Sequence, residues 1–240
     1  MHIVAQLQLL ATIGLATALN PNCAPGGNID LSKFTLQLPS GSAGHPDQIS
    51  SAQLKGCNGY QGQYFSTDKT DGSVVFKVPT FGTCVTTPNS KHCRSELRES
   101  SPSSWSPNSA TNRLFGDLKV VKASSSSICV GQIHIDESVS VKPVAELYYH
   151  ADGSLTFGVE QTRSGGNQKV FNVGKVTPGA RFTYEIRYEK NVLSVSLNGK
   201  AATTYSTFQL NAPPSYFKAG NYDQGSDATE VHFYGVTITH

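Results

Sequence analysis

One segment of the sequence places two side chains with acid–base and hydrogen-bonding chemistry side by side. In residues 128–136 the neighbours of Gln132 and His134 are mainly β-branched, which predicts a strand. Because strand side chains alternate between faces, Gln132 and His134 share one face, and Ile133 and Ile135 share the other. An amide beside an imidazole on an otherwise apolar strand indicates a polar site. The alternative for His134 alone is an ordinary core or surface histidine.

The same alternation gives two further polar faces. In residues 94–99, Arg94, Glu96 and Arg98 point the same way. Each such face, taken alone, also fits the solvated side of a half-exposed antiparallel sheet. If the three strands are neighbours, with the strand of Gln132 in the middle, they form a cationic groove rich in hydrogen-bonding groups. Residues 216–224 supply the third face: Tyr216, Lys218, Gly220, Tyr222 and Gln224.

These groups suggest both a ligand and a reaction. Such a groove suits an acidic linear polymer, because arginine binds a carboxylate through two parallel hydrogen bonds. Glu96 lies between two arginines and is expected to hold both in place. Glycoside hydrolysis usually needs two carboxyl groups, whereas these faces offer only Glu96.

The groups suit proton abstraction next to a carboxylate instead. Arginine and glutamine would neutralise a uronate carboxylate, so that the neighbouring C5 proton becomes acidic enough to remove. A histidine or tyrosine would take that proton, and a tyrosine would protonate the leaving 4-oxygen. This β-elimination needs no cofactor, and the sequence predicts no metal site.

The rest of the chain predicts the strands that must carry these faces. Turn signals such as Asp71-Gly72, Asp152-Gly153 and Asn198-Gly199 separate short apolar or alternating segments. No segment has helical periodicity over ten or more residues. We therefore predict an all-β, single-domain β-jelly roll, a sandwich of two antiparallel sheets. Residues 39–63 are predicted to be mostly loop. The expected strands include 34–38, 73–78, 94–99, 113–122, 128–136, 144–149, 155–159, 169–173, 182–188, 192–197, 200–205, 216–224 and 231–239.

Composition and the N-terminal segment indicate the class of protein. The chain has 240 residues, with 19 Lys and Arg against 17 Asp and Glu, and no basic run, which argues against nucleic-acid binding. Residues 1–18 resemble a secretory signal peptide, because the apolar stretch 7–15 is too short to span a bilayer and Ala16-Thr17-Ala18 fits a cleavage site. A structural N-terminal helix is the alternative. We predict a secreted, extracellular monomer with no membrane segment and one domain over residues 19–240.

The five cysteines fit an oxidising compartment. Four cysteines allow three pairings, and the sequence does not decide between them. We favour Cys84–Cys93, which closes a short loop, and Cys23–Cys57, which would pin the N-terminus. Cys129 lies in an apolar strand and is expected to be a buried free thiol. No Cys-x-x-Cys or His/Cys spacing indicates a zinc site.

Together the three polar segments resemble the signature blocks of the alginate lyases of polysaccharide lyase family 7. The resemblance implies a β-jelly roll with a groove across its concave sheet, and it covers most of the chain from about residue 28 onward. The matching residues, in the same order and spacing, are Arg94-Ser95-Glu96-Leu97-Arg98, Gln132-Ile133-His134 and Tyr216-Phe217-Lys218-Ala219-Gly220-Asn221-Tyr222-Asp223-Gln224.

The resemblance also implies a role for each residue. Arg94, Arg98 and Gln132 would bind and neutralise the uronate carboxylate. His134 would act as the base for one C5 epimer or would position the sugar. Tyr222 would donate a proton and could also act as the base. The catalytic set is thus Arg98, Gln132, His134 and Tyr222, and the further substrate-binding residues are Arg94, Glu96, Tyr216, Lys218 and Gln224.

Two alternatives stay open at this point. Glucuronan lyases of polysaccharide lyase family 20 are similar in fold and mechanism, and the motifs do not separate glucuronan from alginate. Within family 7, isoleucine between the glutamine and the histidine is associated with activity on guluronate-containing blocks. The other alternative is a non-catalytic jelly-roll carbohydrate-binding protein, which would leave the histidine and tyrosine pair unexplained.

Overall fold

Strands account for almost all regular structure in the computed structural model, which describes residues 18–88 and 90–240. The signal peptide predicted for residues 1–18 lies outside the described residues, apart from Ala18. Two four-residue helices, α1 (Pro25–Asn28) and α2 (Ser51–Leu54), are the only α-helices in the described ranges. None of the helices found there is long and apolar enough to cross a membrane.

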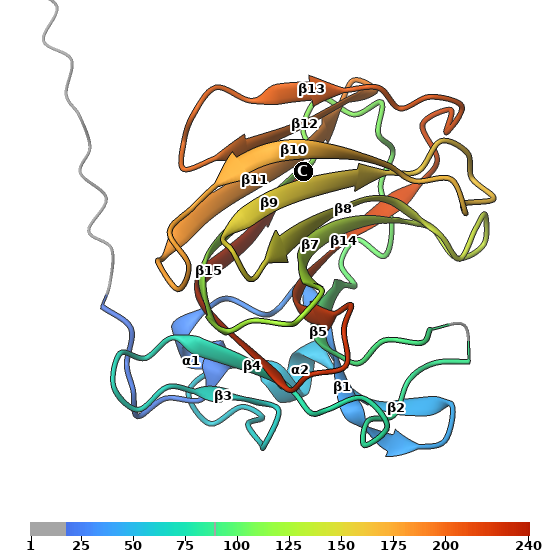
Figure 1. Cartoon of the computed structure of the whole chain (residues 1–240). Coiled ribbons are helices and arrows are strands. Elements are labelled where there is room, and N and C mark those ends of the chain that lie inside the picture. The colour runs from blue at the N-terminus through green and yellow to red at the C-terminus, as the bar shows by residue number, and fades with distance from the viewer. Residues whose placement is uncertain (1–17, 89) are drawn as a thin grey trace, which may run out of the picture.

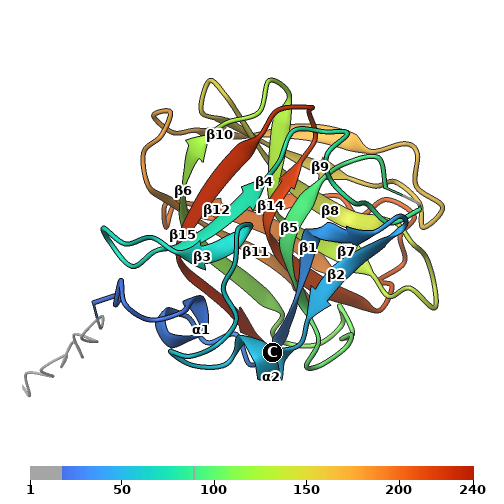
Figure 2. The ribbon, with the colours of Figure 1, turned by 90° about the horizontal axis from the view of Figure 1, so that it is seen from below.

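The strands form two antiparallel sheets, as predicted for a jelly roll. Figure 1 shows β10, β9, β8, β7 and β14 following one another across one layer, and Figure 2 shows β3, β4 and β15 to one side of β5, β1 and β2. The eight-stranded sheet, here called the groove sheet, has the spatial order β10 (Lys169–Lys175), β9 (Ser154–Val159), β8 (Pro143–His150), β7 (Ser127–Ile135), β14 (Ser215–Asp223), β5 (Arg94–Glu99), β1 (Phe34–Ser42) and β2 (His45–Ile49). The seven-stranded back sheet has the order β13 (Thr203–Tyr205), β12 (Val192–Leu197), β11 (Phe182–Glu189), β6 (Arg113–Lys122), β15 (Thr229–Thr239), β4 (Val74–Val78) and β3 (Phe65–Thr67).

The core lies between the two sheets and follows from the alternation of side chains. Buried and less buried positions alternate along most of β6 and throughout β11. The opposing face comes from the groove sheet, where Ile133, Ile135 and Phe217 are fully buried. The apolar faces predicted for the two site strands therefore form part of the core, and their polar faces point to the other side of the sheet.

Tyr184 on β11 crosses the sandwich and fixes the start of the site strand β7. Its hydroxyl donates to the backbone oxygen of Val130 at 2.8 Å. Its ring lies where side chains at Gly116 and Gly131 would otherwise be, since a Cβ at Gly116 would approach a Tyr184 ring carbon to 2.5 Å. The pairing of β7 with β8 shifts register between Cys129 and Gly131. Tyr184 thus holds the irregular segment that precedes Gln132.

The structure corrects the prediction that residues 39–63 are mostly loop. The first strand continues to Ser42, and β2 pairs with it through Leu36–Ile49 and Gln37–Gln48. The sequence of β2, His-Pro-Asp-Gln-Ile, has little strand propensity, so pairing with β1 rather than local preference makes it a strand. A proline is tolerated there because β2 is an edge strand. The strand expected at 200–205 is shorter than predicted, because β13 covers only its last three residues.

The favoured cysteine pairing is confirmed. Cys23–Cys57 ties the N-terminal segment to the chain that follows α2, and Cys84–Cys93 closes the loop that leads into β5. Cys129 is a free and fully buried thiol, as expected. The second disulfide matters for the site, because its loop borders the groove.

Candidate active site

A groove with a volume of about 680 Å³ lies over the groove sheet. Its walls and floor come from β1, β2, β5, β7, β8 and β14 and from the loops beside them. Glu96 alone among the nine predicted site residues does not line it, because its carboxylate is buried beneath the floor. The eight that do are Arg94, Arg98, Gln132, His134, Tyr216, Lys218, Tyr222 and Gln224.

The three predicted site strands are neighbours, but their order differs from the expectation. The strand of Tyr216 and Tyr222, β14, lies in the middle, with β5 and β7 on either side. Lys218 is opposite Arg98 on β5 and Gln132 on β7. Tyr216 is opposite His134. The polar faces of the three strands thus form one continuous surface.

Glu96 is the centre of a buried charge cluster. Its Oε2 accepts from Arg94 Nη1 at 3.2 Å and pairs with Lys218 Nζ at 2.5 Å, while its Oε1 accepts from Gln132 Nε2 at 2.6 Å. Burial opposes ionisation, but the charges of Lys218 and Arg94 outweigh it and hold the pKa of Glu96 below its ordinary value. Burial beside the Arg94 charge lowers the pKa of Lys218. Glu96 is therefore an ionised anchor under the groove.

The structure corrects the prediction that Glu96 holds both arginines. Arg98 instead donates to the backbone oxygen of Glu99 at 3.0 Å and lies 3.9 Å from Glu137 Oε1. Lys218, which is opposite Arg98 on the neighbouring strand, takes the second cationic position on Glu96. Spacing along one strand could not reveal this, because the competing cation comes from another strand.

Arg98, Tyr216 and His134 form a stack along the groove. The guanidinium of Arg98 lies 4.0 Å from the centre of the Tyr216 ring, and that ring stacks on His134 at 5.1 Å. The Tyr216 hydroxyl donates to Glu137 at 3.1 Å. Burial first, and then the charge of Lys218, lowers the pKa of His134 to about 4. The imidazole is therefore neutral at neutral pH.

The tautomer of His134 follows from its backbone contact. Its Nδ1 lies 2.8 Å from the backbone oxygen of Ile135, which can only accept, so Nδ1 carries the proton. Nε2 is then left with a lone pair. A neutral imidazole with that lone pair is a competent proton acceptor.

Tyr222 is enclosed by Arg94 and by the loop before β5. The guanidinium of Arg94 lies 3.7 Å from the centre of the Tyr222 ring, and the hydroxyl of Tyr222 is 3.2 Å from Ser90 Oγ. Burial raises the pKa of Tyr222, although Arg94 opposes the shift. The phenol is thus protonated at neutral pH and can donate. Gln224 donates to the backbone oxygen of Tyr222 at 3.1 Å, so it supports the strand end as well as lining the groove.

Several groove residues were missed by the sequence reasoning. The sequence suggested a single carboxylate, but Glu137, Glu146 and Glu160 also line the groove. Glu146 is opposite Gln132 in register, and burial raises its pKa even though Tyr148 donates to it at 2.6 Å. Alternation along residues 144–149 would have placed Glu146 on the polar face. The number of carboxylates in the groove therefore does not exclude glycoside hydrolysis.

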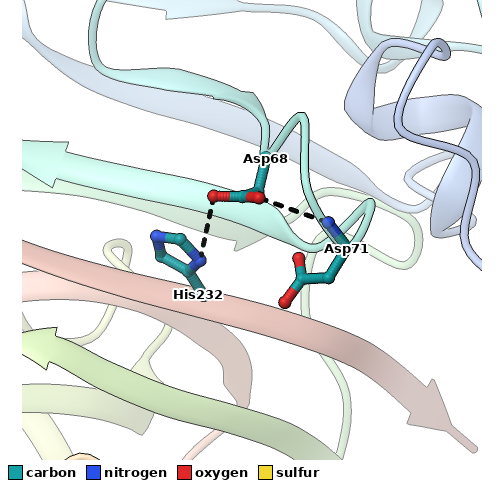
Figure 3. Close-up of side chains that lie close together, drawn as sticks. All are labelled: Asp68, Asp71 and His232. Atoms are coloured by element: carbon teal, nitrogen blue, oxygen red, sulfur yellow. Dashed lines mark hydrogen bonds and ion pairs between the residues drawn. The ribbon is translucent and has the colours of Figure 1, made fainter.

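A second cluster of titratable groups lies on the back sheet, away from the groove (Figure 3). Asp68, Asp71 and His232 bring carboxylate and imidazole atoms within 4.8 Å of one another. Protein donors already occupy them: the Asp71 backbone N–H donates to Asp68 at 3.3 Å, and Tyr234 and Lys119 contact the Asp71 carboxylate at 2.7 and 3.5 Å. The charge of Lys119 disfavours a cation there. We assign this cluster to fastening the turn between β3 and β4 onto β15.

Comparison with known proteins identifies the family. A family model described as alginate lyase matches residues 29–240. An alginate lyase from Klebsiella pneumoniae is 26% identical, and the match covers 90% of this chain and 91% of that protein. A variant of the family 7 alginate lyase A1-II′, solved in complex with a product, is 33% identical, with 91% of this chain and 99% of that chain covered and a TM-score of 0.78. An alginate lyase structure from Pseudomonas aeruginosa is 30% identical, with 88% and 99% covered and a TM-score of 0.75. The chain therefore belongs to the alginate lyase family, and it is a polysaccharide lyase.

Proposed function

We propose that this protein is a secreted lyase that cleaves a 1,4-linked polyuronate, with alginate as the first candidate, by β-elimination. The products would carry 4,5-unsaturated uronate ends. The observation that carries the proposal is that one groove is lined by both a neutral His134 and a protonated Tyr222, together with the cations of β5 and β14. One group is ready to accept a proton, and the other is ready to donate one.

Carboxylate binding would be the first task of the site. Arg98 is the cation best placed for it, because its protein partners are a backbone oxygen and an exposed carboxylate at 3.9 Å. Gln132 on β7 and Arg98 on β5 lie on either side of Lys218 on β14. Neutralising the uronate carboxylate stabilises the negative charge that develops when C5 loses its proton.

Proton transfer would follow in a balanced step. His134 Nε2 removes the C5 proton, the electron pair of that C–H bond forms the double bond between C4 and C5, and the bond between C4 and the 4-oxygen breaks. The Tyr222 hydroxyl gives its proton to the departing oxygen. For a uronate of the opposite C5 configuration, the proton faces the other way, and Tyr222 would serve as base and acid in turn.

The relatives support a polysaccharide as the substrate. Variant forms of the alginate lyase A1-II′ have been solved with a product bound and with a substrate bound. The groove of this chain suits such a polymer, since Arg94, Arg98 and Lys218 line it and the groups beside them can bind sugar hydroxyls. Glucuronan is the second candidate, because glucuronate and mannuronate share the C5 configuration on which this chemistry acts.

The test is a substrate panel with the purified protein. Polyguluronate, polymannuronate, alternating alginate and glucuronan are each incubated with it, and the ultraviolet absorbance of unsaturated uronate ends is followed while the products are sized. We expect absorbance to rise with at least one alginate. A rise with glucuronan alone would favour the second candidate. Binding of a polymer with no rise for any of the four would contradict the lyase and favour a carbohydrate-binding protein.

Secretion and a monomeric state are part of the same proposal. The two disulfides support an oxidising compartment. We expect protein recovered from culture medium to begin after Ala18 and to have the mass of one chain by light scattering. Protein that stays inside the cell with its first 18 residues attached would contradict secretion.

A further inference from the structure

Ser90 lies outside the three polar segments, yet its hydroxyl touches two of the residues in them. Ser90 Oγ is 3.2 Å from the Tyr222 hydroxyl and accepts from Arg94 Nη2 at 3.0 Å. It also lines the groove. A single oxygen atom therefore links a buried guanidinium to the phenol that would donate the proton.

The loop that carries Ser90 is closed by a disulfide. Cys84–Cys93 joins its two ends, and Cys93 is directly followed by Arg94 at the start of β5. Inside the loop, the His92 backbone N–H donates to Ser90 Oγ at 3.3 Å. The rings of His92 and Tyr222 pack edge-to-face, with the ring centres 6.0 Å apart. The disulfide thus holds the Ser90 hydroxyl against Tyr222.

The direction of the hydrogen bonds follows from what each group can do. A guanidinium only donates, so Ser90 Oγ accepts from Arg94 and keeps its own hydrogen for another acceptor. Among the described residues, two acceptors are in reach: the His92 backbone oxygen at 3.2 Å and the Tyr222 hydroxyl oxygen at 3.2 Å. Once Tyr222 has lost its proton, the phenolate is the stronger acceptor, because a charged acceptor forms the stronger bond.

We propose that Ser90 is a positioning residue for the lyase reaction, whose hydroxyl, held by the Cys84–Cys93 loop, orients the Tyr222 hydroxyl and stabilises its phenolate. The proposal rests on the proposed function. Ser90 keeps its own proton throughout: Tyr222 gives a proton to the 4-oxygen, Ser90 donates a hydrogen bond to the resulting phenolate oxygen, and solvent returns a proton to Tyr222 before the next cycle. Arg94 polarises the Ser90 hydroxyl and so strengthens that bond.

The acidity of Tyr222 gives the proposal a readout that a purely structural residue would not move. Burial raises the pKa of Tyr222, and Arg94 and the Ser90 hydrogen bond oppose the rise. Removing the Ser90 hydroxyl should therefore raise this pKa further. The phenol must be protonated to donate, so kcat falls at high pH, where Tyr222 loses its proton; the pH of this fall is the alkaline limit of kcat. Removing the Ser90 hydroxyl would move this alkaline limit to higher pH and would lower kcat at neutral pH.

The first experiment compares Ser90→Ala with Ser90→Thr and with Thr83→Ala, which removes a loop hydroxyl that bonds only to the Thr80 backbone among the described residues. We expect Ser90→Ala to lower kcat about tenfold, the effect of one hydrogen bond to a charged group, with little change in KM. Its alkaline limit should rise, whereas Ser90→Thr and Thr83→Ala should keep kcat and the limit close to wild type. Unchanged kcat and an unmoved limit in Ser90→Ala would overturn the proposal.

A double-mutant cycle separates positioning from general damage to the fold. In the Tyr222→Phe background there is no phenolate to stabilise, so adding Ser90→Ala should lower the residual kcat no further. An equal tenfold loss in both backgrounds would overturn the proposal. If the wild-type protein cleaves no polyuronate, the proposed function is wrong. If the wild-type protein is active and the Ser90→Ala variant has the same kcat and the same alkaline limit, only the role proposed for Ser90 is wrong.

The disulfide gives a test that leaves Ser90 in place. Replacing both cysteines, Cys84→Ser with Cys93→Ser, should lower kcat in the same direction as Ser90→Ala, because the loop no longer holds the hydroxyl. Adding Ser90→Ala to this pair should then have little further effect. Wild-type kcat in the double cysteine variant would overturn the role assigned to the loop.

Discussion

Two arginine–tyrosine stacks in the groove are built from the same two strands but differ in how firmly the protein holds the arginine. Arg94 lies over Tyr222 at 3.7 Å, and Arg98 lies over Tyr216 at 4.0 Å. Arg94 is tied to the fully buried carboxylate of Glu96, and its own side chain is only 12% exposed. Both stacks have the same chemistry and similar geometry, so their surroundings must decide their roles.

The stack at Arg98 is held far more loosely. The side chain of Arg98 is 31% exposed, and its acidic partner Glu137 is 64% exposed and 3.9 Å away. An exposed ion pair of this kind contributes about 0–1 kcal/mol and exchanges partners readily. Arg94 is therefore suited to fixing Tyr222, and Arg98 is suited to leaving Glu137 for a substrate carboxylate.

The largest expected effect separates the two tyrosines. Tyr222→Phe should lower kcat roughly 10²–10⁴-fold, because it deletes the group that donates the proton. Tyr216→Phe deletes a hydroxyl that donates to Glu137, and it should lower kcat by less than about tenfold. Steady-state kinetics on the best polyuronate of the panel measure both. Near-normal kcat in Tyr222→Phe, or equal losses in the two variants, would contradict the comparison.

The next effect separates the two arginines. Arg98→Ala should raise KM and lower kcat together while changing the free energy of unfolding by less than about 1 kcal/mol, because its ion pair is exposed. Arg94→Ala leaves Glu96 with fewer partners in a buried site and should reduce that free energy by roughly 2–4 kcal/mol. Urea unfolding and kinetics on the same preparations check this. An unchanged KM in Arg98→Ala would make Arg98 a structural residue.

The pH dependence on the acid side comes from the stack of Arg98, Tyr216 and His134. His134 accepts a proton only when it is neutral, so activity that depends on it is present above its pKa of about 4 and lost as pH falls through that value. We expect kcat/KM for the preferred substrate to persist well below the range where an ordinary histidine protonates. A loss centred near pH 6.5, the ordinary value for histidine, would show that His134 is not shifted or is not the base.

The smallest expected effect concerns salt. In the proposed function the groove would attract a polyanion mainly through Arg98, whose side chain is 31% exposed, and added salt screens attraction between partly exposed charges. Raising the salt concentration from about 20 mM to about 200 mM should increase KM several-fold with little change in kcat. The Arg98→Ala variant should show a weaker salt dependence than wild type. A KM independent of salt would argue against electrostatic binding of the polymer.

Alternation along the chain was enough to predict which side chains share a face. The strands at 94–99, 113–122 and 192–197 have the predicted bounds, and Gln132 and His134 lie on the polar side of β7, as predicted. Local rules succeed here because strand geometry fixes the direction of each side chain from its neighbours. The same rules failed for β2, whose residues have little strand propensity and whose pairing with β1 is supplied from elsewhere in the chain.

The sequence by itself determined the chemistry available to this protein: the all-β pattern, the three polar faces, and the residues that mark the family. Only the tertiary structure decided how that chemistry is arranged. It put β14 between β5 and β7, gave Glu96 to Lys218 rather than to Arg98, and brought Ser90 to Tyr222. The physical reason is the separation along the chain of the residues that set each feature. The side-chain face is set by adjacent residues, whereas the partner of a charge depends on which distant strands pair and on which cation reaches a buried carboxylate.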